Sequence, residues 1–536
     1  MSSCLRLSTS KIAVALILAA LLLTSCCVHK RDPLLTALER SGYSQLAGSP
    51  EIAKFLAKLA GRTAEAEGLT IATSALGRPV DALLISSEMH RFKDGLPSPD
   101  KITLMLVGSQ HGTEPSGAEA LLLAAREIVE GSLHSYVEDM NFVLIPNSNP
   151  DGRDLHRRVN GNGVNLSTNF TVLSEPESRG IMEALYTWKP EVVLDVHESA
   201  VLKKKSLAKQ GYLIDFEAQF EGANNPNVDC EIRTFSFDRL LPHVIARVNG
   251  HGLHAQRYIG EITDIKQPIT HGGLSLRNLR NVAGMMGSFS FLLENKLDPS
   301  TGAYPTPRNI RARVAKQYLC ISSFLRSCHT YRAEIIRLAG NARTRWQNHQ
   351  TEEPLFLIAA YIADPKQPCI ALPLKKLETG ERVKRSFRYH GRVACRSALT
   401  LPVAYIVTAH QKAIQDVLDR HHVKYEMVDE AAELSVEIQP PMGRQDTMTR
   451  PGHGGNDDVA RNRLEKYAPR QGDLMINLDQ PSRRLIPLLL EPESSTSIFK
   501  SEAYAHLVDG RRGSFVHRVY TLQRKTKSEV IHRLCR

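Results

Sequence analysis

The sequence predicts an α/β domain with a mixed central sheet and helices on both faces, followed by a smaller β-rich C-terminal domain. Between residues 50 and 300, apolar stretches of strand length alternate with amphipathic stretches of helix length. After residue 352 the pattern changes to closely spaced apolar and β-branched runs. The chain has 536 residues, 42% of them hydrophobic, which is enough for one large core and a second domain.

The N-terminal half contains clear signals for individual elements. The amphipathic pattern of residues 52–64 predicts a helix, and residues 70–86 resemble two strands around the glycine-containing turn Leu76–Pro79. The sequence PNSNPDG predicts a turn after an apolar strand at 141–145. The same signals predict further strands at 102–107, 192–196 and 288–295, and further helices at 117–130 and 176–188.

The C-terminal half has shorter and less regular signals. We expect helices at 306–324, 330–348 and 411–421, and apolar runs of strand type at 354–362, 368–374 and 398–409. Residues 439–472 are rich in proline, glycine and charge and predict a loop or linker, and strands are expected at 474–478 and 484–490. These patterns predict an α/β domain at 50–345 and an accessory β-rich domain at 350–536.

Three residues at predicted strand ends can form a metal site. His111 and Glu114 lie in QHGTEPSG, directly after the strand at 102–107, and His197 lies in DVHES after the strand at 192–196. Zinc accepts histidine nitrogen and carboxylate oxygen, and a catalytic zinc keeps one position open for water. Glu294 ends a third apolar run and can exchange a proton with that water. The set predicts metal-assisted hydrolysis with one zinc ion per chain.

Each of these residues also has an ordinary explanation when taken alone. An H-x-x-E pair often lies on a solvated helix face, and His197 or Glu294 could be a polar residue at the end of a strand. Their shared position favours the metal site, because loops at strand ends are where open α/β sheets bind ligands.

The charge balance gives no sign of a nucleic-acid partner. The formal net charge is +11, and many of the basic residues lie near the C-terminus. No nucleic-acid motif accompanies them and aromatic residues are sparse, so we expect a solvated basic tail near an anionic surface and no nucleic-acid binding.

The first 26 residues predict an export signal. Arg6 and Lys11 precede the short apolar stretch Ile12–Leu23, which ends in Thr24, Ser25 and Cys26. This end resembles the lipobox of bacterial lipoproteins, in which the cysteine is lipidated. The alternatives are an ordinary secretory signal or an uncleaved anchor. The resemblance implies a signal peptide at 1–26, a tether at 27–49, and a lipid-anchored protein of the bacterial cell envelope. Cys27 stands where an aspartate would retain the protein in the inner membrane, so the outer membrane, facing the periplasm, is expected.

Several motifs together resemble the zinc carboxypeptidase family over residues 50–335. They are the G-R-P turn at 77–79, HGTE, NPDG at 149–152, the arginines before GVNLSTNF, DVHE and the late SFLLEN, all in the family's order. The resemblance implies that His111, Glu114 and His197 bind zinc and that Glu294 is the general base and acid. It also implies an arginine that polarises the scissile carbonyl. Arg158 fits the R-x-N-x-x-G-V pattern better than its neighbour Arg157.

The chain departs from this family where substrates are recognised. The aspartate that usually orients a ligand histidine is replaced by Asn165, and the Asn-Arg pair that grips a terminal carboxylate is replaced by Ser167 and Thr168. Neither hydroxyl can form a charged fork to a carboxylate. The tyrosine expected before the catalytic glutamate is missing as well. Arg277 and Arg280, in the loop that stands in its place, are candidates for the lost positive charge.

The predicted function is zinc-dependent hydrolysis of peptide bonds by a metallocarboxypeptidase with altered recognition of the substrate terminus. A peptide or a peptidoglycan stem peptide is the expected substrate. One alternative is a zinc deacylase of N-acyl amino acids, similar to succinylglutamate desuccinylase and aspartoacylase. The other is an envelope binding protein that has lost turnover.

Overall fold

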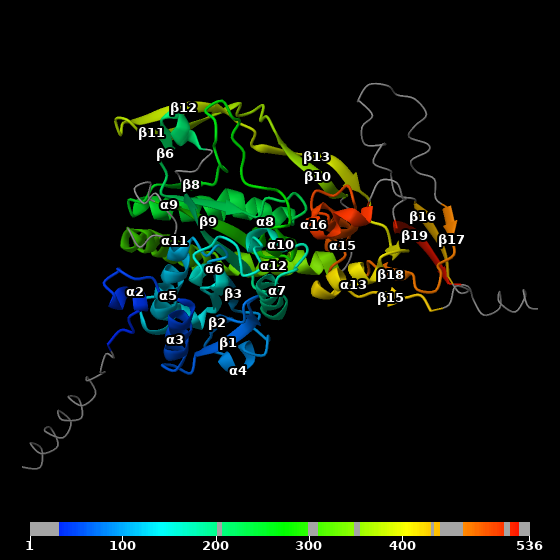
Figure 1. The fold of residues 1–536 in the computed structure, drawn as a ribbon, viewed down its shortest axis with the longest axis horizontal. Coiled ribbons are helices and arrows are strands. Elements are labelled where there is room, and N and C mark those ends of the chain that lie inside the picture. Colours follow the sequence, from blue (N-terminus) through cyan, green and yellow to red (C-terminus); the bar gives the residue numbers. More distant parts are fainter. Residues whose placement is uncertain are drawn as a thin grey trace, which may run out of the picture. The chain divides into compact units, whose positions relative to one another are not determined.

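An eight-stranded mixed sheet organises the N-terminal half of the chain (Figure 1). Its central strands β4, β3, β5 and β9 are parallel, whereas β1 and β2 at one side and β7 against β9 are antiparallel. The order is β1 (Ala66–Thr73), β2 (Pro79–Ile85), β4 (Met140–Ile145), β3 (Ile102–Gly108), β5 (Val192–Ala200), β9 (Phe289–Leu297), β7 (Ala218–Gly222) and β8 (Ala255–Arg257). The predicted mixed α/β fold is therefore confirmed.

Helices cover both faces of this sheet. On one face Val107, Ile145 and Val193 pack against α7 (Pro176–Trp188) and α10 (Leu279–Met285) in one apolar cluster. The alternate side chains of the same strands point to the opposite face. There α3 (Ser49–Ala60), α5 (Pro115–Glu130) and α11 (Ile310–Thr330) pack against the sheet and one another. All residues of β3 and β4 are buried, as expected for strands covered on both sides.

The C-terminal half is rich in antiparallel strands. β11 (Cys369–Lys376) and β12 (Arg382–Arg388) form a hairpin. The strands on either side of it in the chain, β10 (Leu355–Ile362) and β13 (Arg392–Leu399), pair with each other. A six-stranded sheet follows. Its strands are β15 (Glu426–Met427), β18 (Leu474–Asn477), β14 (Ala404–Val407), β19 (Val516–Arg524), β16 (Leu434–Gln439) and β17 (Glu465–Tyr467). The β-rich character expected for this half is confirmed, while the domain boundaries stay predictions.

The two halves share a sheet and a core next to the candidate site. The short strand β6 (Tyr212–Ile214), from the first half, pairs with β11 of the second. The apolar face of the β11–β12 hairpin, with Leu372 and Leu374, packs on Phe216 and Ile262 of the first half. The second half therefore supports the loops that surround the carboxyl ends of the central strands.

Most predicted elements are observed, and two are wrong in type. The loop or linker expected at 439–472 contains the short strand β17, which pairs with β16. Residues 484–490 were expected to form a strand but contain the helix α15 (Leu485–Leu490), whose residues are all buried. A short apolar run has no polar positions to reveal a helical period. Pro487 lies in the first turn, where backbone N–H groups have no partner within the helix, so it does not disrupt the helix.

The region between β5 and β9 gave no clear signals in the sequence. It contains β6, β7, β8 and α10 together with the helices α8 (Cys230–Phe235) and α9 (Leu241–Gly250). The strands here have only three to five residues, which is too short for an alternating pattern to stand out.

The computed structural model describes residues 32–200, 206–297, 309–347, 354–429, 434–439, 465–508 and 515–524. Of the described residues, those from 36 onward form one compact unit, and residues 32–35 contain no helix or strand. Among the described residues, no helix is long and apolar enough to cross a membrane. Cys26, the predicted lipidation site, lies outside the described residues.

A buried histidine joins the C-terminal half to a loop of the first half. His421, directly after α13 (Gln411–Arg420), donates from Nε2 to the carbonyl oxygen of Thr171 at 2.9 Å. Its Nδ1 lies 3.4 Å from the hydroxyl of Tyr186 on α7. Burial lowers the pKa of His421 from 6.5 to about 4. The folded protein thus holds this imidazole neutral.

This burial predicts a loss of stability in mild acid. Between pH 6.5 and about 4 the unfolded chain binds a proton at His421 that the folded chain does not, so stability falls as the pH falls through this window. At pH 5.5 the expected loss is about 1 kcal/mol. We expect the difference in melting temperature between pH 7.5 and 5.5 to be smaller for His421→Gln than for the wild type. The exposed control variant His251→Gln should behave as the wild type, and an equal pH response in all three proteins would contradict the assignment.

Candidate metal centre

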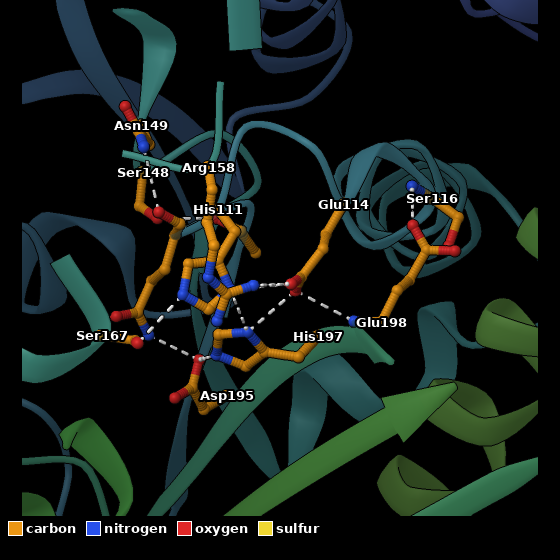
Figure 2. Close-up of polar contacts among 12 residues, drawn as sticks. His111, Glu114, Ser116, Ser148, Asn149, Arg158, Ser167, Asp195, His197 and Glu198 are labelled. Atoms are coloured by element: carbon orange, nitrogen blue, oxygen red, sulfur yellow. Dashed lines mark hydrogen bonds and ion pairs between the residues drawn. The ribbon is translucent and has the colours of Figure 1, made fainter. Parts of the chain in front are cut away.

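The candidate ligands meet at the carboxyl ends of two neighbouring parallel strands (Figure 2). His111 follows β3 in a tight loop, and His197 lies within β5. Glu114 immediately precedes α5, and its backbone N–H donates to the carbonyl oxygen of His111 at 3.0 Å. All three side chains are buried, with 3 to 4% of each residue exposed. The three residues therefore lie together as predicted, although His197 lies inside β5, which continues to Ala200.

A close backbone contact explains why the HGTE and NPDG motifs occur together. A Cβ atom at Gly112 would lie 1.9 Å from the carbonyl carbon of Gly152. No side chain can be accommodated at such a distance, so residue 112 must be glycine. The loop that carries His111 is thereby fixed against the helix α6 (Pro150–Asp154) of the second motif.

The two histidines direct the same ring nitrogen at Glu114. His111 Nδ1 lies 2.8 Å from Glu114 Oε1, and His197 Nδ1 lies 3.0 Å from Glu114 Oε2. The two Nδ1 atoms are 3.2 Å apart. Among the described residues, these three form the one group with suitable ligand atoms close together, all within 4.8 Å of one another.

Oxygen acceptors hold the outer nitrogen of each histidine. Asp195 Oδ1 lies 2.9 Å from His197 Nε2 and also accepts a hydrogen bond from Gln110 at 2.6 Å. Asn165 Oδ1 lies 3.0 Å from His111 Nε2. These contacts fix the orientation of each ring and leave Nδ1 for the centre, which is how outer partners orient metal-binding histidines.

The geometry fits a tetrahedral zinc ion. Two ligand atoms bound to such an ion at 2.0–2.1 Å lie about 3.3 Å apart. The observed separations of 2.8, 3.0 and 3.2 Å need only a small expansion to match this value. Two imidazole nitrogens and one carboxylate are also a donor set of catalytic zinc sites. The residues present therefore fit the metal that the sequence predicts.

The buried charges of the centre are strongly coupled. Burial opposes ionisation of Glu114, but His111 and His197 beside it hold the pKa of its carboxyl well below the usual range. Burial also disfavours charge on His197, yet Asp195 and Glu114 hold its pKa well above 6.5. For His111 burial dominates and lowers the pKa. Glu114 is therefore held as a carboxylate by the positive charge beside it.

A second set of buried contacts fixes the end of β5. The backbone N–H of Glu198 donates to Glu114 Oε2 at 3.0 Å, and the Glu198 side chain accepts from the backbone N–H of Ser116 at 3.0 Å. Arg313 on α11 forms two bonds to the Glu198 carboxylate, of 2.8 and 2.9 Å. One turn later, Gln317 donates to the carbonyl oxygen of His197 at 2.9 Å. Helix α11 therefore holds the strand that carries a ligand.

Glu294 lies on β9, directly opposite His197 in the parallel register. Residues in register on neighbouring strands point to the same side of a sheet. Glu294 also lines a cavity together with Phe216, Gln219 and Glu261. Its position beside the ligand strand is the one that the sequence predicted.

Arg158 contacts the centre directly, whereas Arg157 does not. The Arg158 side chain is 55% exposed, and its Nη1 lies 2.8 Å from Glu114 Oε1 (Figure 2). Arg157 is exposed, and its backbone N–H donates to the carbonyl oxygen of Gly152 at 2.8 Å. The contact with Glu114 favours Arg158 as the arginine of the site.

The other residues predicted to bind substrate have different surroundings. Ser167 Oγ lies 3.0 Å from both His111 Nε2 and Asn165 Oδ1, so it supports a candidate ligand. The hydroxyl of Thr168 donates to the carbonyl oxygen of Asn165 at 3.1 Å. Arg277 is exposed, whereas Arg280 is buried with 3% exposure. Their roles in substrate binding stay predictions.

Residues that support the ligands were missed in the sequence. Asp195 stands two residues before His197, and alternate residues of a strand point to one side, so this partner was open to prediction. Arg313 and Gln317 lie more than 100 residues after His197, and only the packing of α11 brings them to the site. No local pattern marks them.

Comparisons with known proteins agree with the site. Residues 52–197, the segment with all three candidate ligands, match a family described as zinc carboxypeptidase. A carboxypeptidase 2 of Trichophyton rubrum is 25% identical over 204 residues, covering 37% of this chain and 38% of that protein. Carboxypeptidase D of Mus musculus is 28% identical over 127 residues, covering 21% of this chain and 9% of that protein. The chain thus spans well under half the length of these relatives.

Among solved structures, a metallo-carboxypeptidase from Burkholderia cenocepacia aligns with a TM-score of 0.41 and 15% identity, covering 54% of this chain and 71% of that one. The matched family supports a zinc-dependent metallopeptidase, and neither the deacylase nor the silent binding protein is favoured. The segment that builds the candidate metal centre is therefore similar to zinc carboxypeptidases.

Proposed function

We propose that this protein hydrolyses peptide bonds with zinc held by His111, Glu114 and His197, as a carboxypeptidase with altered recognition of the substrate terminus. The observation that supports it best is the convergence of both Nδ1 atoms on Glu114 while both Nε2 atoms are held from outside. This arrangement supports metal binding, because it directs two imidazole nitrogens and one carboxylate to the same point. One ion per chain is the proposed stoichiometry, since this is the one such group among the described residues.

When bound, zinc supplies Lewis acidity that polarises the scissile carbonyl and lowers the pKa of an attacking water. Glu294 is the proton carrier of the proposed reaction. Its carboxylate takes a proton from the water and delivers it to the nitrogen of the leaving amine. The register of β5 and β9 places the backbone of Glu294 beside that of His197, and Glu294 is not one of the three residues whose ligand atoms lie together.

Arg158 stabilises the charge that develops on the carbonyl oxygen. Its guanidinium already reaches the centre through Glu114, yet more than half of the side chain is exposed, so it can also contact a substrate. A fixed positive group beside a developing oxyanion lowers the barrier in acyl-transfer reactions.

In this proposal, the terminal carboxylate of the substrate is not bound by the residues at positions 167 and 168. Ser167 and Thr168 are engaged with His111 and Asn165, and neither carries a charge. The positive group that binds a terminal carboxylate must therefore come from elsewhere. The candidates are Arg277, on the loop before α10, and Arg280, which lies in the first turn of α10 and not on the loop expected from the sequence.

We further propose that the protein is lipid-anchored at Cys26 in a bacterial cell envelope, on the outer membrane facing the periplasm. Peptides or peptidoglycan stem peptides are the substrates that this location would supply. The lipobox-like sequence before Cys26 is the observation that supports it.

The experiment that tests the function is digestion of a mixed peptide and muropeptide library by the purified protein, followed by mass spectrometry. We expect stepwise loss of single C-terminal residues, which a zinc chelator abolishes and added zinc restores. Zinc content is measured on the same sample. Zinc-loaded protein that leaves every peptide intact would contradict the proposal.

Replacing Glu294 separates proton transfer from metal binding. We expect Glu294→Gln to keep its zinc and to lose about 10²–10⁴-fold in kcat, because an amide cannot accept the proton. Steady-state kinetics and metal analysis measure the two properties. Glu67→Gln, an exposed carboxylate on the edge strand β1, is the matched control and should keep full activity. Full activity of Glu294→Gln would move the general base to another residue.

Replacing Arg313 tests how α11 positions the metal centre. Arg313→Lys keeps the positive charge but loses the paired bonds to Glu198, so the end of β5 is held less firmly. We expect zinc affinity, measured by competition with a chelator, to fall about 10-fold or more. Arg326→Lys on the same helix, where the arginine contacts Tyr136, is the control and should leave the affinity unchanged. Wild-type zinc affinity in Arg313→Lys would show that the contact does not position the ligands.

A further inference from the structure

Arg280 is a buried cation without an anionic partner among the described residues. Its Nη2 donates to Asn224 Oδ1 and to the carbonyl oxygen of Gly273, both at 3.0 Å, and both acceptors are neutral. Within the same part of the chain, its Nε has no hydrogen-bond partner. Other buried arginines differ: Arg153 pairs with Glu119, and Arg313 pairs with Glu198. An unpaired buried charge is costly, so its presence indicates a site where an anion binds.

The surroundings of Arg280 do not neutralise it. The nearby Arg257 is already paired with the buried Glu221, through bonds of 2.9 and 3.0 Å. His271 is held between the carbonyl oxygen of Tyr258 and the hydroxyl of Tyr389, and burial lowers its pKa. The group formed by Arg280, Arg257, Glu221 and His271 therefore has a net charge of +1, which is the charge of Arg280.

The guanidinium lies behind a cavity wall made of glycines. A Cβ atom at Gly272 would lie 3.2 Å from both Nη1 and Nη2, so the absence of a side chain there keeps the charge close to the cavity. Gly272 and Gly273 line this cavity together with Tyr258, Gly260 and Glu261. Glu261 is exposed to solvent, so its charge is well screened.

This cavity adjoins the one that Glu294 lines. Gly260 and Glu261 line both of them. Tyr258 lies near both charged groups: burial raises the pKa of its hydroxyl, the charge of Glu294 raises it further, and the charge of Arg280 lowers it. Glu294 and Arg280 therefore belong to neighbouring cavities, and a substrate that spans both cavities reaches both groups.

Taken with the proposed function, on which this step rests, we propose that Arg280 binds a carboxylate of the substrate's last residue. Its charge replaces the one that Ser167 and Thr168 cannot provide. Two carboxylates of a peptide have the required chemistry, the terminal α-carboxylate and the side chain of a terminal aspartate or glutamate. Both are planar anions that suit a guanidinium.

Four matched peptides distinguish these sources. They share one sequence and end in Glu or Gln, each as the free acid and as the C-terminal amide. Binding is measured by calorimetry on zinc-loaded Glu294→Gln protein, so that the peptides are not consumed. We compare the Glu294→Gln protein with the double variant that also carries Arg280→Gln. We expect the double variant to bind the peptides that have the recognised carboxylate 10-fold or more weakly. If Arg280 binds the α-carboxylate, the protein with Arg280 intact should lose the same affinity when the peptide is amidated at its C-terminus. If Arg280 binds the side chain, that protein should lose this affinity when the terminal Glu of the peptide is replaced by Gln.

Controls separate this site from folding and from the other arginine. Arg239→Gln, on the exposed surface, should bind as its parent does, and Arg280→Lys should keep part of the affinity. If the protein with Arg280 intact binds all four peptides equally, the proposal is overturned. This result does not depend on whether Arg280→Gln folds. A loss in Arg277→Gln without one in Arg280→Gln would overturn it too. Zinc-loaded wild type that binds the peptides through Arg280 but never cleaves them would instead refute the proposed peptidase function.

Discussion

The buried carboxylate of Glu114 is the charge around which the centre is built. It accepts contacts from both ring Nδ1 atoms, from Arg158 and from the backbone of Glu198. An anion at this depth is stable only when donors or cations surround it completely. The loop after β3, the end of β5 and the start of α5 must therefore keep fixed positions relative to one another. A metal ion satisfies the same requirement, because it binds the carboxylate and both nitrogens at once.

This requirement extends well beyond the ligands. Gly112 must lack a side chain so that its loop can rest on Gly152, and Glu198 must be neutralised by Arg313 so that the end of β5 stays in place. The C-terminal half contributes at a greater distance, since the β11–β12 hairpin packs on loops beside the Glu294 cavity. The residues proposed for substrate recognition differ from those proposed for hydrolysis in how their charges are balanced. The ligands are fully partnered, whereas Arg280 remains a buried positive charge whose proposed partner comes with the substrate.

The parts of this structure that could be predicted are those with local signals. Long apolar runs gave β3, β4, β5 and β9. The position of His111, His197 and Glu294 directly after three of these runs gave the candidate site, although β5 and β9 continue past His197 and Glu294. Supporting residues such as Arg313 escaped prediction, because tertiary packing alone brings α11 to β5. The same limit applies to Arg280, whose burial no sequence pattern reveals. The helix at Leu485–Leu490 was mistaken for a strand because an apolar run of six residues fits either structure.

The central claim is that His111, Glu114 and His197 bind zinc through the two Nδ1 atoms and the carboxylate. A crystal structure of the zinc-loaded protein, with anomalous diffraction measured at the zinc absorption edge, tests it most directly. The account predicts one anomalous peak per chain, about 2.0–2.2 Å from both Nδ1 atoms and from a Glu114 oxygen. A peak bound through either Nε2 atom, or no peak between these residues at saturating zinc, would contradict it.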